Sequence, residues 1–200
     1  MNTIATKFLD GRAVQIELEK YVRKSKLVRF AVAFWGDGAP SKLGLLGKRG
    51  NVEIVCNLKM GGTNPEVIEA LIKSGFVVSQ SDHLHGKVYL FDDTVILGSS
   101  NASANGLSFQ NGEIEGWHEA NLVTADPIVY RDASAWFEKL PRRAISHDDI
   151  ERAKEAWSRR RKVGFGQAPP SRQTLIDAIK SSPEDFSRTT DICLSLFRRI

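Results

Sequence analysis

The sequence predicts an α/β domain in which a mixed, largely parallel β-sheet has helices on both faces, followed by a helical C-terminal extension. Apolar runs rich in β-branched residues alternate with amphipathic segments along most of the chain. A strand, a helix and a second strand follow one another between residues 51 and 81, and such a crossover makes its two strands parallel. Because 42% of the 200 residues are hydrophobic, the chain can bury one substantial core.

The first predicted elements are a helix and a strand. Apolar residues at helical spacing among charged ones predict an amphipathic helix over residues 11–25. The run LVRFAVAFWG (27–36), rich in apolar and aromatic residues, predicts a strand directly after it.

The next segment forms the predicted crossover. NVEIVCNL (51–58) and FVVSQS (76–81) are typical of strands. Between them, residues 64–75 are predicted to form a helix, with Asn64 as its N-cap and Gly75 at its C-terminal end.

A hairpin is predicted next. KVYLF (87–91) and TVILG (94–98) have the composition of strands, and Asp92 and Asp93 between them are typical turn residues. We therefore expect the two strands to pair.

The remaining elements of the main domain are one strand and two helices. EANLVTA (119–125) predicts the strand, and the helix over 126–140 begins with Asp126 as cap and Pro127 in its first turn. Residues 146–161 predict a second helix, acidic at its start and basic at its end, as the helix dipole favours.

The domain organisation follows from these elements. We expect one main domain over residues 1–162, a linker over 163–171 that includes the Gly- and Pro-rich GFGQAPPS, and a helical segment over 172–200. A missing domain beyond that segment is left open. No apolar run is long enough for a signal peptide or a membrane span, so a cytoplasmic protein without membrane contact is expected.

The cysteines and the charge distribution indicate which metals and macromolecules the chain is expected to bind. Cys56 and Cys193 lie too far apart for a zinc site or a disulfide framework, so no metal or cofactor is expected, and Cys56 should be buried in its strand. The net charge of +4 is concentrated between residues 139 and 162. This cluster is either a solvated helix face or a surface that neutralises nucleic-acid phosphates. The candidates for such contacts are Arg142, Arg143, Arg159, Arg160, Arg161 and Lys162.

The hairpin region has the residues of a reactive site. On a strand, residues two apart project from the same face, so His85 and Lys87 present an imidazole beside an ammonium group. Lysine supplies a charge for phosphodiester oxygens, and histidine acts as a nucleophile or exchanges a proton near neutral pH. Downstream, Gly98 allows close backbone approach, while Ser99 and Asn101 offer hydroxyl and amide donors.

These residues resemble the signature of the phospholipase D superfamily, H-x-K-x4-D followed by G-S-x-N. His85, Lys87, Asp92, Gly98, Ser99 and Asn101 match it in order, and chance would produce the whole pattern in about one such chain in 10⁵. The family's further acidic residue, at the opening of the next strand, is best matched by Glu119, with Glu113 and Glu115 as rivals.

The resemblance implies roles for the matched residues. His85 would attack phosphorus and form a phosphohistidine, Lys87 and Asn101 would hold the phosphoryl oxygens, and Ser99 would assist. Glu119 would orient the imidazole, as catalytic histidines generally require. Asp92 is expected to be structural, because it belongs to the hairpin turn.

The resemblance also implies a partner. Its mechanism uses two motif histidines and this chain has one motif, so we expect a homodimer with one shared site. His83 or His118 as the second histidine within a monomer is a less favoured alternative.

The single motif resembles bacterial endonucleases, so a metal-independent DNA endonuclease is the first hypothesis. An RNA nuclease, a phospholipid phosphodiesterase and a non-catalytic nucleic-acid-binding module are the alternatives.

Overall fold

The computed structural model describes residues 6–48, 51–104, 106–107 and 118–162. The predicted linker over 163–171 and the helical segment over 172–200 lie outside the described residues, as do Glu113 and Glu115.

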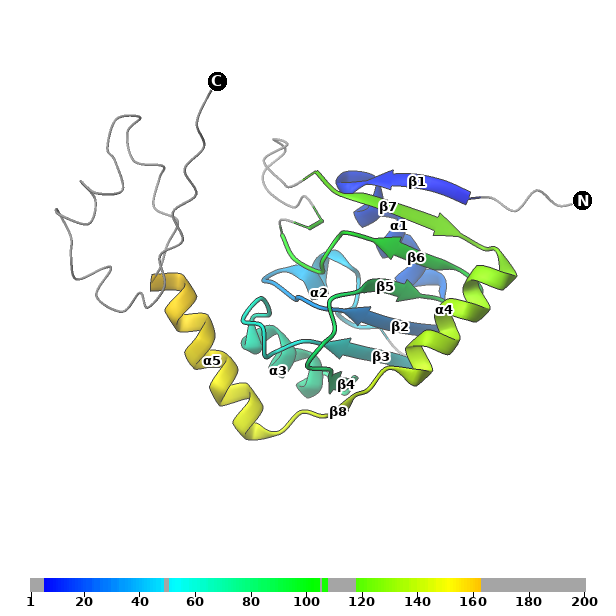
Figure 1. The fold of residues 1–200 in the computed structure, drawn as a ribbon. Coiled ribbons are helices and arrows are strands. Elements are labelled where there is room, and N and C mark those ends of the chain that lie inside the picture. Colours follow the sequence, from blue (N-terminus) through cyan, green and yellow to red (C-terminus); the bar gives the residue numbers. More distant parts are fainter. Residues whose placement is uncertain (1–5, 49–50, 105, 108–117, 163–200) are drawn as a thin grey trace, which may run out of the picture. The chain divides into compact units, whose positions relative to one another are not determined.

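In the described residues, eight strands form one mixed sheet in the order β1-β7-β6-β5-β2-β3-β4-β8 (Figure 1). The strands are β1 (Thr6–Asp10), β2 (Leu27–Val32), β3 (Asn51–Cys56), β4 (Val77–Gln80), β5 (Lys87–Leu90), β6 (Val95–Gly98), β7 (Ala120–Thr124) and β8 (Arg143–Ala144). The helices are α1 (Gly11–Lys24), α2 (Ala39–Lys42), α3 (Pro65–Lys73), α4 (Pro127–Lys139) and α5 (His147–Lys162).

The mixed α/β class is confirmed, but the expectation of a largely parallel sheet is wrong. Only the β2–β3 and β3–β4 pairs are parallel, and the other five pairings in the described sheet are antiparallel. Parallel neighbours need a crossover, and the chain supplies helical crossovers only as far as β4. From β5 onwards the turn at Asp92 and Asp93 reverses the chain, which makes the neighbouring strand antiparallel.

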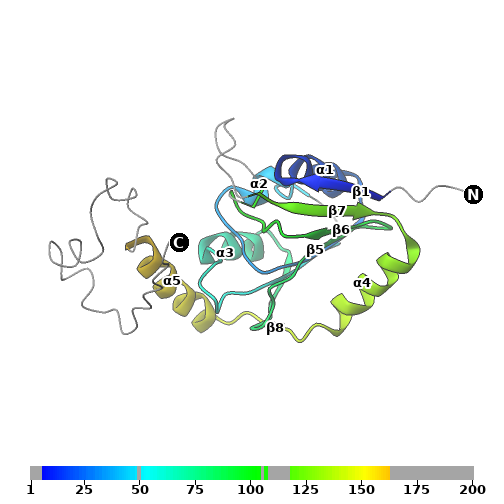
Figure 2. The ribbon, with the colours of Figure 1, turned by 45° about the horizontal axis from the view of Figure 1, so that its top comes forward.

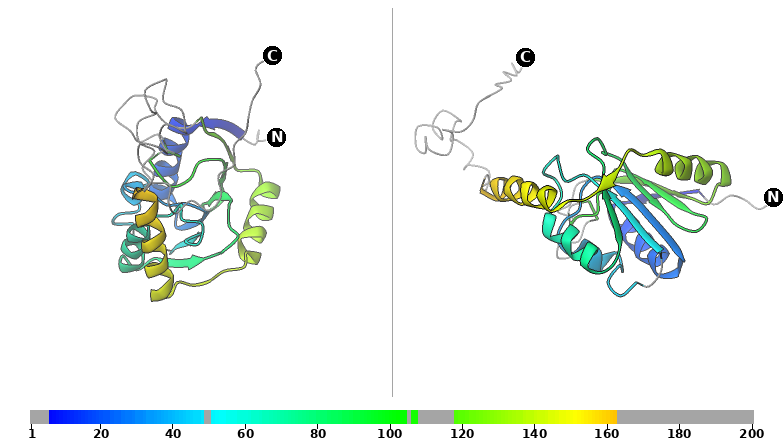
Figure 3. Two further views of the ribbon diagram at one scale, coloured as in Figure 1. Left: turned by 60° about the vertical axis from the view of Figure 1, so that its left-hand side comes forward. Right: turned by 90° about the horizontal axis from the view of Figure 1, so that it is seen from below.

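Helices cover both faces of the sheet, as predicted. The residues Val14, Leu18 and Val22 of α1 pack with Ile68 and Leu71 of α3 in the larger apolar core. On the opposite face, Phe137 of α4 packs into a second, smaller cluster. Figures 2 and 3 show α4 on one side of the sheet and α1 and α3 on the other.

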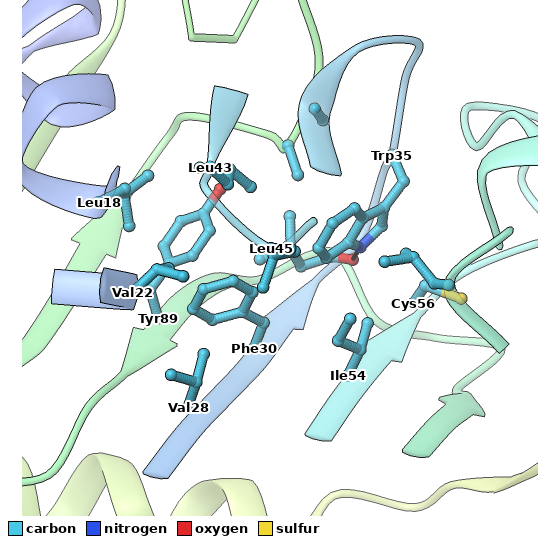
Figure 4. Packing of buried hydrophobic residues seen from close by; sticks show 14 of the residues in the cluster. Leu18, Val22, Val28, Phe30, Trp35, Leu43, Leu45, Ile54, Cys56 and Tyr89 are labelled. Atoms are coloured by element: carbon cyan, nitrogen blue, oxygen red, sulfur yellow. Dashed lines mark hydrogen bonds between the residues drawn. The ribbon is translucent and has the colours of Figure 1, made fainter. Parts of the chain in front are cut away.

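The larger core is centred on aromatic side chains. The ring of Phe30 in β2 lies 5.0 Å from that of Tyr89 in β5 and 6.2 Å from that of Trp35, measured between centroids (Figure 4). Cys56 is buried in the same cluster, as predicted, and burial raises the pKa of its thiol to about 12. The thiol is therefore protonated and unreactive at neutral pH.

The predicted helix caps are present. The Asn64 side chain accepts a hydrogen bond from the Glu66 N–H at the start of α3, and Asp126 accepts from Ile128 and Val129 at the start of α4. These side chains satisfy amides that have no partner inside their helices.

Two short edge strands were not predicted. β1 pairs antiparallel with β7, and its last residue, Asp10, caps α1 by accepting from the amides of Arg12 and Ala13. β8 pairs with β4 through two residues, which is too short for a pattern of alternating hydrophobicity.

Asp92 ties the hairpin turn to the start of β2. Its carboxylate accepts from the Leu27 N–H at 2.7 Å and from the Lys26 N–H at 3.0 Å. Partial burial raises the pKa of Asp92, but these hydrogen bonds outweigh it and hold the pKa below its ordinary value. The turn lies at the end of β5 away from His85 and Lys87.

A buried polar network holds the other end of the hairpin. Asn121 of β7 donates from Nδ2 to Ser100 Oγ at 2.8 Å and accepts from the Ser100 N–H at 3.2 Å. The Tyr89 hydroxyl donates to the Ser100 carbonyl at 2.8 Å. All three residues are buried, so the segment after β6 is clamped between β5 and β7.

Replacing Asp92 by alanine should lower the free energy of unfolding by about 1 kcal/mol at pH 7, because two amide donors lose a charged acceptor. Since the folded pKa of Asp92 is lowered, its contribution exists above the unfolded pKa and disappears as pH falls through the folded one. Urea denaturation at several pH values should show that the free energies of unfolding of the wild type and Asp92→Ala become equal in acid. Asp93→Ala is the control, and equal losses in both variants at pH 7 would contradict the prediction.

Replacing Asn121 by alanine should cost about 1–3 kcal/mol, because it leaves buried polar groups of Ser100 without their partner. Chemical denaturation measures this loss. Asn51→Ala, at the exposed start of β3, is the matched control and should change stability by less than about 0.5 kcal/mol. A similar small effect at Asn121 would show that the network does not stabilise the fold.

Candidate active site

The residues predicted to carry the chemistry lie at one end of the sheet. His85 and Lys87 are at the start of β5, Ser99 and Asn101 follow β6, and Glu119 directly precedes β7. Because β5, β6 and β7 are antiparallel neighbours, the start of β5, the end of β6 and the start of β7 meet at the same edge (Figure 1).

His85 and Lys87 are in direct contact. The Lys87 Nζ lies 3.4 Å from His85 Nε2 and donates to the His85 carbonyl at 2.6 Å. An ammonium group at this position makes Nε2 the acceptor, with the ring proton on Nδ1 when the imidazole is neutral. His85 is exposed, whereas Lys87 is 8% exposed, so the imidazole is reachable and the lysine lies below it.

Burial lowers the pKa of Lys87, and the negative charge of Glu119 opposes that shift. The carboxylate thus favours the charged form of a lysine that is largely removed from water. A phosphate oxygen would meet a cation whose position is already set by the His85 carbonyl.

Asn101 has its amide orientation set by the backbone. Its Oδ1 accepts from the Phe34 N–H at 3.3 Å, which directs the two Nδ2 donors elsewhere. The side chain is half-buried, and no hydrogen bond to another described residue occupies these donors. An amide held in this way donates to an oxygen anion without first having to reorient.

Ser99 and Glu119 form a second contact pair. The Ser99 hydroxyl donates to Glu119 Oε2, and the same oxygen atom of Ser99 accepts from the Ala120 N–H at 3.0 Å. In the described residues no hydrogen bond joins Glu119 to His85. The Glu119 carboxylate instead contacts Ser99, and its charge raises the pKa of Lys87 against the effect of burial.

Gly98 permits the close approach of β6 and β7. A Cβ atom at this position would lie 2.4 Å from the Ala120 carbonyl oxygen and 2.4 Å from Asn121 Oδ1. Any larger residue would push the strands apart and displace Ser99, which is the next residue.

Phe34 belongs to the site but was missed from the sequence. Its ring meets the His85 ring edge to face at 5.8 Å, and Lys87 Nζ lies 5.9 Å from its centroid. Gly62 makes room for it, since a Cβ there would lie 2.5 Å from the phenyl ring. The contact depends on the pairing of β2 with β5, which no local sequence pattern reveals.

The two alternative histidines, His83 and His118, are both exposed. Within the described part of the chain, neither of these imidazoles is hydrogen-bonded to that of His85.

The basic residues are dispersed. Arg142 pairs with Glu53 at 3.1 Å and lies 4.8 Å from the Phe137 ring, where it supports the packing of α4. Arg143 makes a bidentate pair with Asp149 at 2.5 and 2.8 Å. The last turn of α5 contains Arg159, Arg160, Arg161 and Lys162, whose side chains lie outside the described part.

In the described residues, no group of three His, Cys, Asp or Glu side chains is placed to hold a metal ion. None of the helices described is long and apolar enough to cross a membrane.

Comparison with solved structures shows the fold. NucT from Helicobacter pylori has 19% sequence identity and a TM-score of 0.57, with 69% of this chain and 96% of that chain covered. Nuc from Salmonella typhimurium, described as a phospholipase D family member, has 16% identity and a TM-score of 0.55, over 72% of this chain and 100% of that one. Phosphatidylserine synthase from Haemophilus influenzae Rd KW20 has 11% identity and a TM-score of 0.52, over 80% of this chain and 44% of that one.

Comparison of sequences shows the family. No curated protein sequence matches the chain. The family model described as "Cardiolipin synthase, PLD-like domain" matches residues 41–141, just over half of the 200 residues. The match includes His85, Lys87, Ser99, Asn101 and Glu119. The chain therefore belongs to the PLD-like domain family.

Proposed function

We propose that this protein is a metal-independent DNA endonuclease that acts as a homodimer through His85. The observation that carries the proposal is the exposed His85 imidazole in contact with Lys87, beside an Asn101 amide whose oxygen is already engaged. These groups supply a nucleophile, a cation and a neutral donor at one position, which is what phosphodiester cleavage requires.

In the proposed reaction, a nitrogen of the His85 imidazole attacks phosphorus. A P–N bond forms while the P–O bond to the leaving strand breaks, and a second imidazole gives its proton to the leaving oxygen. Water then attacks the phosphohistidine and gives a proton to the second imidazole, while the P–N bond breaks; this frees His85 and leaves a phosphate at one end of the cut strand. The chemistry balances without a metal ion or redox partner.

The other residues stabilise the developing charge. The Lys87 ammonium and the Asn101 Nδ2 donors bind the non-bridging oxygens, which gain negative charge as the nucleophile attacks. Glu119 offsets the cost of burying Lys87, and it holds the Ser99 hydroxyl, which adjoins the same end of the sheet.

The second imidazole comes, in this proposal, from another copy of the chain. The one motif supplies one His85, and neither His83 nor His118 has a hydrogen bond to it in the described residues. A twofold axis through the site would place two His85 side chains on opposite sides of one phosphate.

Coverage of the similar structures favours a nuclease over a phospholipid-processing enzyme. The chain matches NucT and Nuc over 96% and 100% of their lengths, but only 44% of the phosphatidylserine synthase. The single motif resembles bacterial endonucleases. Basic residues of β8 and α5 follow in sequence and would neutralise phosphates of a bound strand.

A phospholipid phosphodiesterase is the second candidate, because the matching family model is described by a cardiolipin synthase. The same site chemistry would act on a lipid phosphodiester. Hydrolysis confined to anionic phospholipid vesicles would favour it. RNA cleavage, or DNA binding without cutting, would favour the RNA nuclease or the binding module instead.

The wild-type protein should cut supercoiled and single-stranded DNA in excess EDTA, and His85→Ala should lose at least about 10³-fold of that activity because no nucleophile remains. Gel electrophoresis of the products gives the rates. His147→Ala, which removes an exposed histidine at the start of α5, should keep the wild-type rate. Equal cutting by the wild type and His85→Ala would overturn the assignment of the nucleophile.

Co-expression of wild-type and His85→Ala subunits tests the shared site. If every active dimer needs two His85 side chains, random pairing in equal amounts leaves one dimer in four active, so a fixed amount of wild type loses about half its activity. Differently tagged subunits allow the mixed dimer to be isolated and assayed. A mixed dimer with half the wild-type activity would show that each subunit works alone.

A further inference from the structure

A cavity of about 390 Å³ lies between the ends of β3 and β4 and helix α5. Its charged and polar lining consists of Lys59, Gln80, Asp82, Arg143, Asp149 and Arg152. The volume is in the range of sites that hold small molecules or parts of larger ones, about 300–1,000 Å³.

We propose that this cavity is a binding subsite for a backbone phosphate of the nucleic-acid strand, close to the phosphate that is cut. The proposal rests on the proposed nuclease function and adds the path that the bound strand takes across the protein. It assigns phosphate contacts to Lys59, Arg143 and Arg152.

The cavity and the site share one loop. Asp82 lines the cavity and His85 follows three residues later, so their Cα atoms are at most about 11 Å apart. A duplex strand advances about 3.4 Å along the helix axis per nucleotide, so this Cα separation equals the axial rise of about three nucleotides at most. Asn57 holds the loop by donating to the carbonyls of Asp82 and Leu84, both at 3.0 Å.

Arg143 is a fixed cation in the cavity wall. Asp149 accepts from it at 2.5 and 2.8 Å and also from the Ser146 N–H and hydroxyl at 2.9 and 2.7 Å. The Arg143 hydrogen bonds hold the pKa of Asp149 well below its ordinary value, so the carboxylate remains charged. Asp149 and the Ala144 carbonyl take three of the five N–H donors of Arg143.

Lys59 and Arg152 are cations in long ion pairs, and Arg152 Nε also donates to the Asp148 carbonyl at 3.2 Å. The Lys59 Nζ lies 3.4 Å from Asp82, and Arg152 lies 4.0 Å from Asp149, with 65% and 75% of their side chains exposed. Exposed pairs at these distances contribute little stability, so a phosphate can replace them at small cost. Three cations face two carboxylates, and one of those carboxylates is already bound by Arg143.

Gln80 adds an independent sign of an incomplete site. Its side chain is 4% exposed and donates to Asp82 Oδ1 at 2.8 Å, while Oε1 has no hydrogen-bond partner in the described structure. A phosphate oxygen is itself an acceptor and cannot satisfy Oε1, so the group that relieves this costly oxygen would be a water that donates both to Oε1 and to the phosphate.

The test compares Lys59→Ala/Arg152→Ala with wild type, using a fluorescent single-stranded oligonucleotide and the small diester bis(p-nitrophenyl) phosphate. Lys73→Ala/Arg131→Ala is the control, because it removes the same charge from the end of α3 and from α4. Binding is measured by anisotropy and cleavage by kcat/KM, each over a range of salt concentrations.

Loss of two phosphate contacts on a single strand should make the salt dependence of log K shallower by about 1.4 and weaken binding about 10-fold at low salt. The ratio of kcat/KM for the oligonucleotide to that for the small diester should fall about 10-fold, whereas the control retains both values. Equal salt slopes in the two double variants, or equal losses on both substrates, would overturn the subsite.

The outcomes separate the subsite from the nuclease proposal. Suppose that the wild type binds the oligonucleotide but cuts nothing, and that the salt slope is shallower in Lys59→Ala/Arg152→Ala as expected. The nuclease function then fails and the subsite stands. If the wild type cuts and the slope is unchanged in Lys59→Ala/Arg152→Ala, only the subsite fails. Binding to anionic vesicles but not to the oligonucleotide would overturn it in favour of a lipid surface.

Discussion

The close contact between the end of β6 and the start of β7 determines the geometry of the site. At Gly98 the two strands approach to a distance that leaves no room for a Cβ atom. That approach lets Asn121 bind the N–H and the hydroxyl of Ser100, and it lets Ser99 reach Glu119. Because Gly98 has no side chain, the strands can set the positions of Ser99, Glu119 and the segment that leads to Asn101.

The site is also organised by compensated charge. Lys87 is removed from water by the sheet, which would favour its neutral form, and the Glu119 carboxylate limits that effect. The lysine is held by a backbone carbonyl and the asparagine by a backbone amide, so neither depends on a flexible partner. Preorganised groups of this kind lose little entropy when a charged oxygen arrives.

Local chemistry explains which features were predictable. Residue spacing was enough to predict that His85 and Lys87 lie side by side, although only Lys87 belongs to β5 and His85 precedes it. The turn residues predicted the hairpin, and Asn64 and Asp126 predicted two helix starts. Long-range pairing explains the rest. The antiparallel β2–β5 contact, which brings Phe34 to His85, leaves no periodic trace in either segment. The sequence did not predict Lys59 as part of a cavity either, because its loop meets α5 only in the folded domain.

The position of β1 has a consequence for synthesis of the protein. This N-terminal strand pairs from Thr6 with Thr124 to Asp10 with Ala120, so its partner leaves the ribosome more than one hundred residues later. Until then β1 has no neighbour in the sheet, and β7, which follows Glu119 directly, has not yet emerged. Such high contact order slows folding and prevents the nascent chain from assembling the reactive end of the sheet before most of the domain has been made.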